Sequence, residues 1–380
     1  MKQPLLSIVI PTKDRYFYLK HLLNYLIDLD RENIEIVIQD NTKDNKEFAE
    51  YLKGIDYPML KYAHVQDQIP ISRNSDMAVL NSTGKYVCFI GDDDGVTSLI
   101  VPCVKYMENE GIDVVVPETV IYKWPDAYNV IKAGGYSACL KYKDFKGKIL
   151  AVNAIDKLNE LIEKGCDDRK GLPLLYHGIV RRRVLDIIYE IGDTYFPGPS
   201  PDIANGVALC MTNCKYVRID MPIIIAGSSK FRGGGARQMK NHAANIEDLP
   251  FLPPKTKENW EEKIPKIWTG RTVWCESSIK AMRYMGREDL VEKVNFEALY
   301  SSFVAHYFPL RKMAYKLTSN KFRLFFVSSW KLLKRGFNVA LRILHINRLS
   351  ETTVEGVNNI ESASEFLDSR YLFLLKKLNG

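Results

Sequence analysis

Short apolar runs alternate with segments of helical periodicity through the first third of the chain. The expected strands are residues 5–10, 34–38, 61–65, 86–90 and 113–117, which are rich in β-branched and aromatic side chains. Between the first two runs, leucines recur at helical spacing and form one apolar stripe: Leu19, Leu22, Leu23 and Leu26. Strand–helix–strand units with short connections predict a mainly parallel sheet with right-handed crossovers, flanked by helices.

The run at residues 86–90 is followed by three adjacent carboxylates, Asp92, Asp93 and Asp94. In an open α/β sheet, ligands bind beyond the carboxyl ends of the strands, which is where these side chains are expected. Like charges in consecutive positions raise one another's pKa unless they share a cation. An all-oxygen cluster suits Mg²⁺ or Mn²⁺, often completed by substrate phosphates. The alternative is a solvated acidic turn, because Asp and Gly are common turn residues.

Prolines and glycines predict several boundaries. Pro11 is expected to close the first strand, and Asp14 to cap the following helix. Pro222 interrupts an apolar run and indicates either an edge strand or two segments. Residues 121–148, rich in Tyr, Gly and Lys, are either a hairpin or an irregular insertion. Residues 227–245 contain three consecutive glycines and four basic side chains, and we expect a mobile loop there.

The composition is that of an ordinary soluble protein, with 46% hydrophobic and 26% charged residues among 380. No apolar run reaches the length of about 18 residues that a transmembrane helix needs, and the run near the N-terminus is too short for a signal peptide. The seven cysteines are scattered without a CxxC pair. We therefore expect buried, reduced thiols in a cytosolic protein.

The net charge of +7 is unevenly distributed. Residues 298–350 contain ten Lys and Arg but no Asp or Glu, and aromatic residues are interleaved with the basic ones. This pattern is typical of an interfacial helix on an anionic membrane. A helical subdomain with a solvated basic face is the alternative. Nucleic acid is not an expected partner, because no known binding module accompanies the patch.

Four motifs occur in the order seen in family 2 glycosyltransferases, and the chain resembles that family. The motifs are SIVIPTKDR at residues 7–15, the strand end at Asp40, ISRN at residues 71–74 and FIGDDD at residues 89–94. Members are inverting enzymes of GT-A fold that use nucleotide-activated sugars. The resemblance implies an α/β, Rossmann-like nucleotide-binding fold with a mixed, mainly parallel sheet flanked by helices, followed by a C-terminal helical region.

The same resemblance suggests a division of the chain. Residues 1–227 are expected to form the catalytic domain, which is divided into a nucleotide-sugar half and an acceptor half at residue 118. A flexible glycine-rich, basic active-site loop would follow at residues 228–257. Residues 258–380 would form the helical region, with a membrane-facing segment at residues 306–348.

The resemblance assigns a donor site to residues of these motifs. Pro11 and Thr12 would line the nucleotide, Asp40 would bind the base, commonly uracil, and Arg73 would lie near the diphosphate or hold the acidic loop. For Asp40, the alternative is a polar loop that leads to a helix cap at Asp44. The full expected donor set is Pro11, Thr12, Asp14, Arg15, Asp40, Arg73, Asn74, Asp92, Lys230 and Arg232.

The acidic triplet corresponds to the family's DXD metal site. Asp93 would be the direct ligand of Mn²⁺ or Mg²⁺, with Asp94 beside it and Asp92 supporting or contacting the ribose. The sequence departs from the family pattern at Gly91, which stands where the first aspartate is usual.

The resemblance also predicts a catalytic base downstream, near the start of a helix. Asp202 fits, because a proline-rich turn at residues 195–201 leads directly into it. The alternative role is a helix N-cap. His177 and His242 are either additional metal or phosphate contacts, or structural residues.

These inferences predict a metal-dependent inverting glycosyltransferase that moves sugar from a UDP-sugar to a glycan or lipid-linked glycan in surface polysaccharide biosynthesis. It would be cytoplasmic and peripherally bound to the inner face of the cell membrane, and homo-oligomer formation is left open. One alternative is a sugar-nucleotide pyrophosphorylase-like enzyme, although residues 11–15 lack the glycine that its signature needs. The other alternative is a non-catalytic glycan-binding scaffold.

Overall fold

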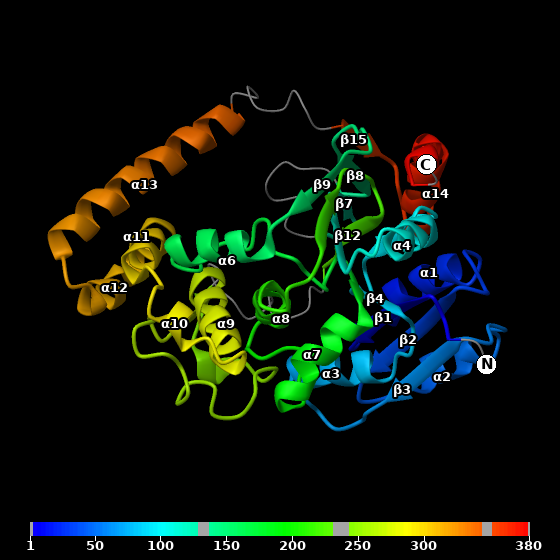
Figure 1. Cartoon of the computed structure of the whole chain (residues 1–380), viewed down its shortest axis with the longest axis horizontal. Coiled ribbons are helices and arrows are strands. Elements are labelled where there is room, and N and C mark those ends of the chain that lie inside the picture. The colour runs from blue at the N-terminus through cyan, green and yellow to red at the C-terminus, as the bar shows by residue number, and fades with distance from the viewer. Residues whose placement is uncertain (1–2, 128–136, 231–242, 344–351, 379–380) are drawn as a thin grey trace.

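A large mixed sheet runs through the computed structural model, which describes residues 3–127, 137–230, 243–343 and 352–378 (Figure 1). Its strands, in spatial order, are β3 (Leu60–His64), β2 (Ile34–Asp40), β1 (Leu6–Thr12), β4 (Tyr86–Phe89), β10 (Ile179–Arg181), β6 (Val114–Pro117), β11 (Tyr216–Ile219) and β9 (Ile149–Val152). The four N-terminal strands are parallel to one another, whereas β10 is antiparallel to both β4 and β6. The carboxyl ends of β1, β2 and β4 therefore meet at one edge.

Four helices connect the N-terminal strands: α1 (Tyr16–Leu26), α2 (Lys46–Leu52), α3 (Ile71–Leu80) and α4 (Ile100–Asn109). The predicted leucine stripe of α1 is buried against the sheet. The prediction that Asp14 caps α1 is wrong, since Arg15 occupies the N-cap position without a side-chain capping bond. Asp14 instead has a positive φ of 57°, in the turn between β1 and α1.

The prediction that Pro11 closes the first strand is also wrong, because β1 continues through Pro11 to Thr12 in register with β2. The backbone carbonyl of Val9 points toward β4, because it accepts the N–H of Ile90. The backbone carbonyl of Thr12 points toward β2, because it accepts the N–H of Asn41. Backbone groups of a strand point to alternate neighbours, so the backbone of Pro11, two residues beyond Val9, also points toward the β4 side. Pairing with β4 ends at Val9, so the missing N–H of Pro11 breaks no ladder bond.

A second, five-stranded sheet lies beside the first. Its order is β15 (Thr352–Glu355), β8 (Cys139–Tyr142), β7 (Val120–Lys123), β12 (Ile224–Ser228) and β5 (Gly95–Val96). The antiparallel pair β7–β8 matches the hairpin interpretation of this region, with residues 128–136 outside the described part. The apolar run around Pro222 forms two segments, as one interpretation predicted, and β11 and β12 belong to different sheets.

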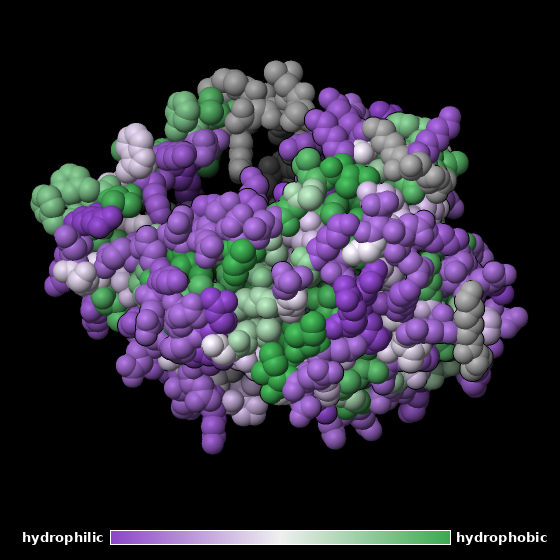
Figure 2. Space-filling model, in the orientation of Figure 1, coloured by the Kyte–Doolittle hydropathy of each residue, from purple (hydrophilic) through white to green (hydrophobic). Residues whose placement is uncertain are grey.

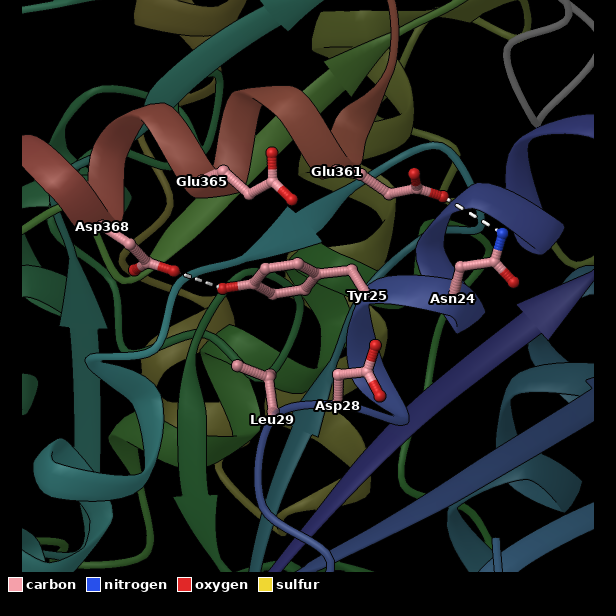
Figure 3. Close-up of a pocket in the computed structure, with 7 residues that line it drawn as sticks. All are labelled: Asn24, Tyr25, Asp28, Leu29, Glu361, Glu365 and Asp368. Atoms are coloured by element: carbon pink, nitrogen blue, oxygen red, sulfur yellow. Dashed lines mark hydrogen bonds between the residues drawn. The ribbon is translucent and has the colours of Figure 1, made fainter. Parts of the chain in front are cut away.

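The C-terminal residues return to the N-terminal unit. After β15, helix α14 (Ile360–Tyr371) lies beside α1 and is followed by the 3₁₀ helix η4 (Leu372–Lys377) (Figure 1). Asp368 accepts bonds from the hydroxyl of Tyr25 (2.6 Å) and the backbone N–H of Ser98 (2.8 Å). Figure 3 shows Tyr25 pointing toward Asp368. Both side chains line a pocket of about 290 Å³ between α1 and α14. Residues 352–378 are thus an integral part of this unit.

The remaining described helices share one hydrophobic core with the large sheet, and α13 lies at the outer edge of this helical part (Figure 1). They are α6 (Ala154–Glu163), α7 (Arg182–Gly192), α8 (Pro201–Cys210), α9 (Gly270–Tyr284), α10 (Glu288–Val291), α11 (Phe296–His306), α12 (Arg311–Leu317) and α13 (Lys321–Ile343), with the turns η2 (Ile246–Asp248) and η3 (Phe308–Leu310) and the short pair β13 (Ala243–Ala244) and β14 (Trp268–Thr269). Of the helices described, none has the length and apolarity to cross a membrane. The expected α/β fold class, with a mixed, mainly parallel sheet, flanking helices and C-terminal helices, is confirmed.

Candidate active site

Side chains at and just after the end of β1 contact the acidic triplet, which follows β4. Thr12, the last residue of β1, donates its hydroxyl to Asp92 Oδ2 at 2.6 Å. Arg15 follows in the β1–α1 turn, and its Nε lies 3.1 Å from Asp92 Oδ1 while its Nη2 lies 2.7 Å from Asp93 Oδ2. Two of the three carboxylates are therefore paired to one guanidinium group.

Residues that follow β7 and β12 of the second sheet support Asp93 from the other side. Ser229 donates its hydroxyl to Asp93 Oδ2 at 2.7 Å, and the indole N–H of Trp124 donates to the Asp93 carbonyl at 2.9 Å. β12 can approach this closely because position 227 is a glycine. A Cβ atom at Gly227 would lie 1.7 Å from the Asp93 carbonyl oxygen, inside any allowed contact.

Asp94 points into the protein, where its two oxygens are fully engaged. Oδ1 accepts the backbone N–H of Gly227 at 2.7 Å, and Oδ2 accepts that of Gly91 at 2.6 Å. The hydroxyl of Tyr176 donates to Oδ2 at 3.1 Å, and His177 Nε2 lies 2.7 Å from the same atom. Both of these residues precede β10, so the antiparallel strand brings them to the carboxyl end of β4.

Burial and charge act differently on the three carboxylates. Burial raises the pKa of Asp92 to about 7, and the nearby Arg15 only partly offsets that effect. Burial also acts to raise the pKa of Asp94, but His177 and the N–H donors of Gly91 and Gly227 outweigh it and leave that pKa below its usual value. Burial and the charge of Asp94 raise the pKa of Tyr176 well above its usual range, so its hydroxyl stays protonated and donates.

The expected metal ligands do not fit a divalent cation in this arrangement. Asp94 is turned away from the other two carboxylates, with three contacts on Oδ2 and one on Oδ1. Asp93 Oδ2 is held by Arg15 and Ser229. Among the described residues, Asp93 Oδ1 has no hydrogen-bond donor, and Asp92 Oδ1 has only its ion pair with Arg15 Nε. In that part of the chain, no cluster of three or more His, Cys, Asp or Glu side chains is arranged to hold a metal ion.

Asp40, the residue expected to bind the base, is fully buried at the end of β2. Its Oδ1 accepts the backbone N–H of Thr42 at 2.8 Å, and its Oδ2 accepts the hydroxyls of Tyr16 and Tyr62, both at 2.7 Å. These contacts fix the β2 end and the start of α1. A direct bond to a nucleobase stays a prediction.

At the start of α3, neither Arg73 nor Asn74 makes a hydrogen bond or ion pair with the triplet in the described part of the chain. Arg73 is exposed and makes no hydrogen bond or ion pair with the other described residues. Asn74 is buried, and its Oδ1 has no partner within the described ranges. Asp76, which the sequence did not single out, accepts the backbone N–H of Tyr195 at 2.8 Å and the hydroxyl of Thr194. Burial raises the pKa of Asp76 to about 6.

Part of the expected phosphate-binding loop falls outside the described residues. Lys230 is described, and its backbone N–H donates to Asp126 Oδ1 at 3.4 Å. Arg232, His242 and the three consecutive glycines lie outside the described ranges. Their expected role in closing over a diphosphate stays a prediction.

Asp202 lies in the first turn of α8, as predicted, but it is not the helix cap. Ser200 is the N-cap residue, and no side chain makes a capping bond there. Asp202 Oδ2 is instead paired with Arg169 Nη1 at 2.8 Å, and Oδ1 accepts the Ser200 hydroxyl at 2.6 Å. No hydrogen bond or ion pair joins Asp202 to the acidic triplet among the described residues.

Sequence reasoning missed Tyr176, Ser229 and Trp124 as parts of the site. Each contacts the triplet from a strand that is distant in sequence or belongs to the second sheet. The order and spacing of motifs along the sequence do not reveal such a contact. The available signals were weak: a Tyr-His-Gly step before β10 and a serine pair after β12.

Residues 7–148 match the family model described as "Glycosyl transferase family 2". This N-terminal part of the chain is a family 2 glycosyl transferase domain. The matched segment contains β1 and the acidic triplet, which carried the resemblance in the sequence. The expected family and the expected enzyme class are therefore confirmed for this domain.

Solved structures of S. aureus TarS are similar to the chain at 16% identity. TarS 1-349 in complex with UDP-GlcNAc gives a TM-score of 0.48, with 83% of this chain and 76% of that chain covered. TarS 1-349 in complex with UDP gives 0.42, with 58% of this chain and 60% of that chain covered. This chain thus spans less than two thirds of the length of the UDP complex. A search of curated protein sequences gives no match.

Proposed function

We propose that this protein transfers a sugar, with inversion, from a UDP-sugar to a hydroxyl of a glycan acceptor, and that Asp202 is the general base. The observation that carries this proposal is the acidic triplet after β4, which Thr12 and Arg15 contact within the segment that matches the family 2 model. Asp202, in the first turn of α8, is the carboxylate that would serve an acceptor beside a donor at the triplet.

The donor would bind at the edge where β1, β2 and β4 end, which is the ligand-binding edge of an open α/β sheet. Thr12 and Arg15 lie at this edge in contact with the triplet. A guanidinium group suits the two phosphates of a nucleotide-sugar, because it offers paired donors in one plane. TarS, whose complexes contain UDP and UDP-GlcNAc, supplies the precedent for this class of donor.

The chemistry requires one proton acceptor. The acceptor oxygen would attack the anomeric carbon from the face opposite the diphosphate, the bond from that carbon to the diphosphate oxygen would break, and the nucleoside diphosphate would leave with the electron pair. Asp202 would take the proton of the attacking hydroxyl, a contribution of about 10²–10⁴ in rate. Its present partner, Arg169, has 41% of its side chain exposed, so the ion pair can open to admit an acceptor.

The acceptor would be glycan carried at an anionic membrane, and α13 would bind that membrane. Five large apolar side chains lie along one face of α13, with exposed fractions from 54% to 75%: Phe322, Phe326, Trp330, Leu333 and Phe337. The opposite face packs on α11, where Leu324 and Ser328 are buried and Lys331 donates to Ser302 Oγ at 2.6 Å. Figure 2 shows hydrophobic side chains at the outer edge of the molecule, over α13.

An anionic lipid surface is the occupant that suits this face. An isolated apolar patch of this size would be unfavourable in water, and residues 298–350 carry only basic charge. Basic residues beside an exposed aromatic stripe describe a helix that lies in the headgroup region. The proposed setting is thus the inner face of the cell membrane, in surface polysaccharide biosynthesis.

Release of UDP from a panel of UDP-sugars, measured with the full chain and with glycan acceptors in anionic vesicles, tests the proposal. One UDP-sugar should release UDP faster when acceptor is present, and it should raise the melting temperature, since ligand binding stabilises the folded state. A protein that binds none of the panel and releases no UDP would contradict the proposed function.

A further inference from the structure

Arg15 lies where its guanidinium group meets two carboxylates of the triplet. Its side chain is 12% exposed, and it contacts Asp92, Asp93 and the hydroxyl of Ser229. The ring of Tyr18 supports it from one side, with 5.2 Å between the guanidinium carbon and the ring centre. A largely buried arginine with this many partners is held in one position rather than solvated.

The oxygens that Arg15 contacts are those that a cation would need. Asp94 is turned inward, where its two oxygens accept the N–H groups of Gly91 and Gly227. Asp92 Oδ2 accepts the Thr12 hydroxyl. This leaves Asp92 Oδ1 and the two oxygens of Asp93 for a cation shared between neighbouring carboxylates. Arg15 contacts Asp92 Oδ1 and Asp93 Oδ2, so a divalent cation and the present position of Arg15 exclude each other.

We propose that Arg15 is the built-in counter-ion of the triplet in the free protein, and that a divalent cation binds only by displacing it. This proposal explains why the expected metal ligands, Asp92 and Asp93, are paired with Arg15. Without any cation, Asp92 and Asp93 would be two buried like charges in adjacent positions. Arg15 supplies that charge until Mg²⁺ or Mn²⁺ arrives.

The local backbone allows Arg15 to move. Arg15 is the N-cap residue of α1, directly after Asp14 with its positive φ, and its carbonyl accepts the N–H groups of Tyr18 and Leu19. These bonds involve only the backbone, so a new position of the side chain leaves them in place. Once displaced, the guanidinium group would be beside the proposed diphosphate and could pair with it. This last step rests on the proposed function, whereas the competition itself does not.

Binding of Mn²⁺ alone to the full chain, measured by titration calorimetry, tests the competition. Arg15→Met removes the charge but keeps the apolar stem, and it should bind Mn²⁺ at least about tenfold more tightly than the unmodified protein, because a competing charge next to the site is gone. Lys13→Met is the matched control. It removes one positive charge from the same turn, where Lys13 is exposed and has no described partner, and its affinity should stay within about threefold of the unmodified protein.

A second measurement covers the case in which Arg15→Met fails to fold. In the unmodified protein, Mg²⁺ should shift the NMR signal of the Arg15 Nε–H group, and Asp93→Asn should abolish that shift. Equal Mn²⁺ affinity in Arg15→Met and the unmodified protein would overturn the proposal, and so would an unmoved Arg15 signal while Mg²⁺ shifts the amides of the triplet. Sugar transfer that persists alongside either result would leave the proposed function intact.

Discussion

The hydroxyl of Tyr176 donates to Asp94 Oδ2 over 3.1 Å, although the two residues are 82 positions apart in the chain. Asp94 follows β4 of the family 2 domain, whereas Tyr176 precedes β10, which inserts antiparallel beside β4. The bond therefore joins the two parts of the large sheet at the point where the acidic triplet lies. It also orients Asp94 inward, which leaves Asp92 and Asp93 to face Arg15.

Removing this hydroxyl should weaken the fold measurably. Tyr176→Phe deletes one of the four contacts of a buried carboxylate, and we expect the free energy of unfolding to fall by about 1.5 kcal/mol. Denaturant unfolding measures the change. Tyr189→Phe is the control, because its ring stacks on Tyr195 but its hydroxyl has no hydrogen bond to a described residue. An equal loss in both variants would contradict a specific role for the Tyr176–Asp94 bond.

Gly227 should not tolerate a side chain. A Cβ atom would lie 1.7 Å from the Asp93 carbonyl, so β12 would have to move away from the triplet, and we expect Gly227→Ala to cost about 3 kcal/mol of stability. Gly336→Ala is the control, since nothing lies within 4 Å of that position in α13. Because alanine favours helix, this control should gain up to about 1 kcal/mol. A stable Gly227→Ala protein, as judged by thermal unfolding, would refute the close approach.

Asp76 should make stability fall as the pH rises. Burial raises its pKa from 3.8 to about 6, so the folded protein binds the proton more tightly than the unfolded chain does. The stabilisation from the neutral carboxyl group is complete below pH 3.8 and is lost as the pH passes 6. The stability of the unmodified protein relative to Asp76→Asn should therefore drop by about 3 kcal/mol from pH 4 to pH 7. Urea unfolding of both proteins at several pH values checks this, and a difference that does not vary with pH would disprove it.

The exposed face of α13 should bind anionic vesicles. Replacing Phe326 and Trp330 together by serine removes two of the five exposed side chains and should weaken binding about tenfold or more, given the apolar area lost from the interface. Sedimentation with phosphatidylglycerol vesicles measures it, with phosphatidylcholine vesicles as the uncharged comparison. Leu150→Ser is the control, because Leu150 is 58% exposed but lies on β9.

Substitution is preferable to truncation in that experiment. Residues 352–378 supply β15 and α14, and Ile360 packs so closely on Gly95 that an added Cβ there would come within 2.6 Å of it. A deletion that removes α13 and everything after it would therefore also damage the second sheet. Unchanged sedimentation of the double serine variant would rule out α13 as the membrane contact.

The sequence predicted the architecture well where periodicity was regular. The leucine stripe of α1 and the alternation of strands and helices through β4 follow from local rules. The two errors, at Pro11 and Asp14, are local as well. Whether proline is tolerated depends on which side of β1 still has a partner, and the sequence of one strand does not contain that information.

The site was predictable only as a list of carboxylates. The contacts that distinguish the three carboxylates come from Tyr176, Gly227 and Arg15, which approach the triplet from three different elements. Arg15 was expected to serve the donor, but its pairing with Asp92 and Asp93 could not be predicted without the path of the β1–α1 turn. The same holds for β15, which joins the second sheet from the far end of the chain.

The most direct test of the central claim is single-turnover sugar transfer by Asp202→Asn. The amide has the shape of the carboxylate but cannot take the proton, so donor binding by calorimetry should be unchanged while the transfer rate falls by about 10²–10⁴. Asp193→Asn is the control, an exposed position at the end of α7 where asparagine suits the left-handed backbone. It should transfer at the unmodified rate. Transfer by Asp202→Asn within about threefold of that rate would contradict the assignment of Asp202 as the base.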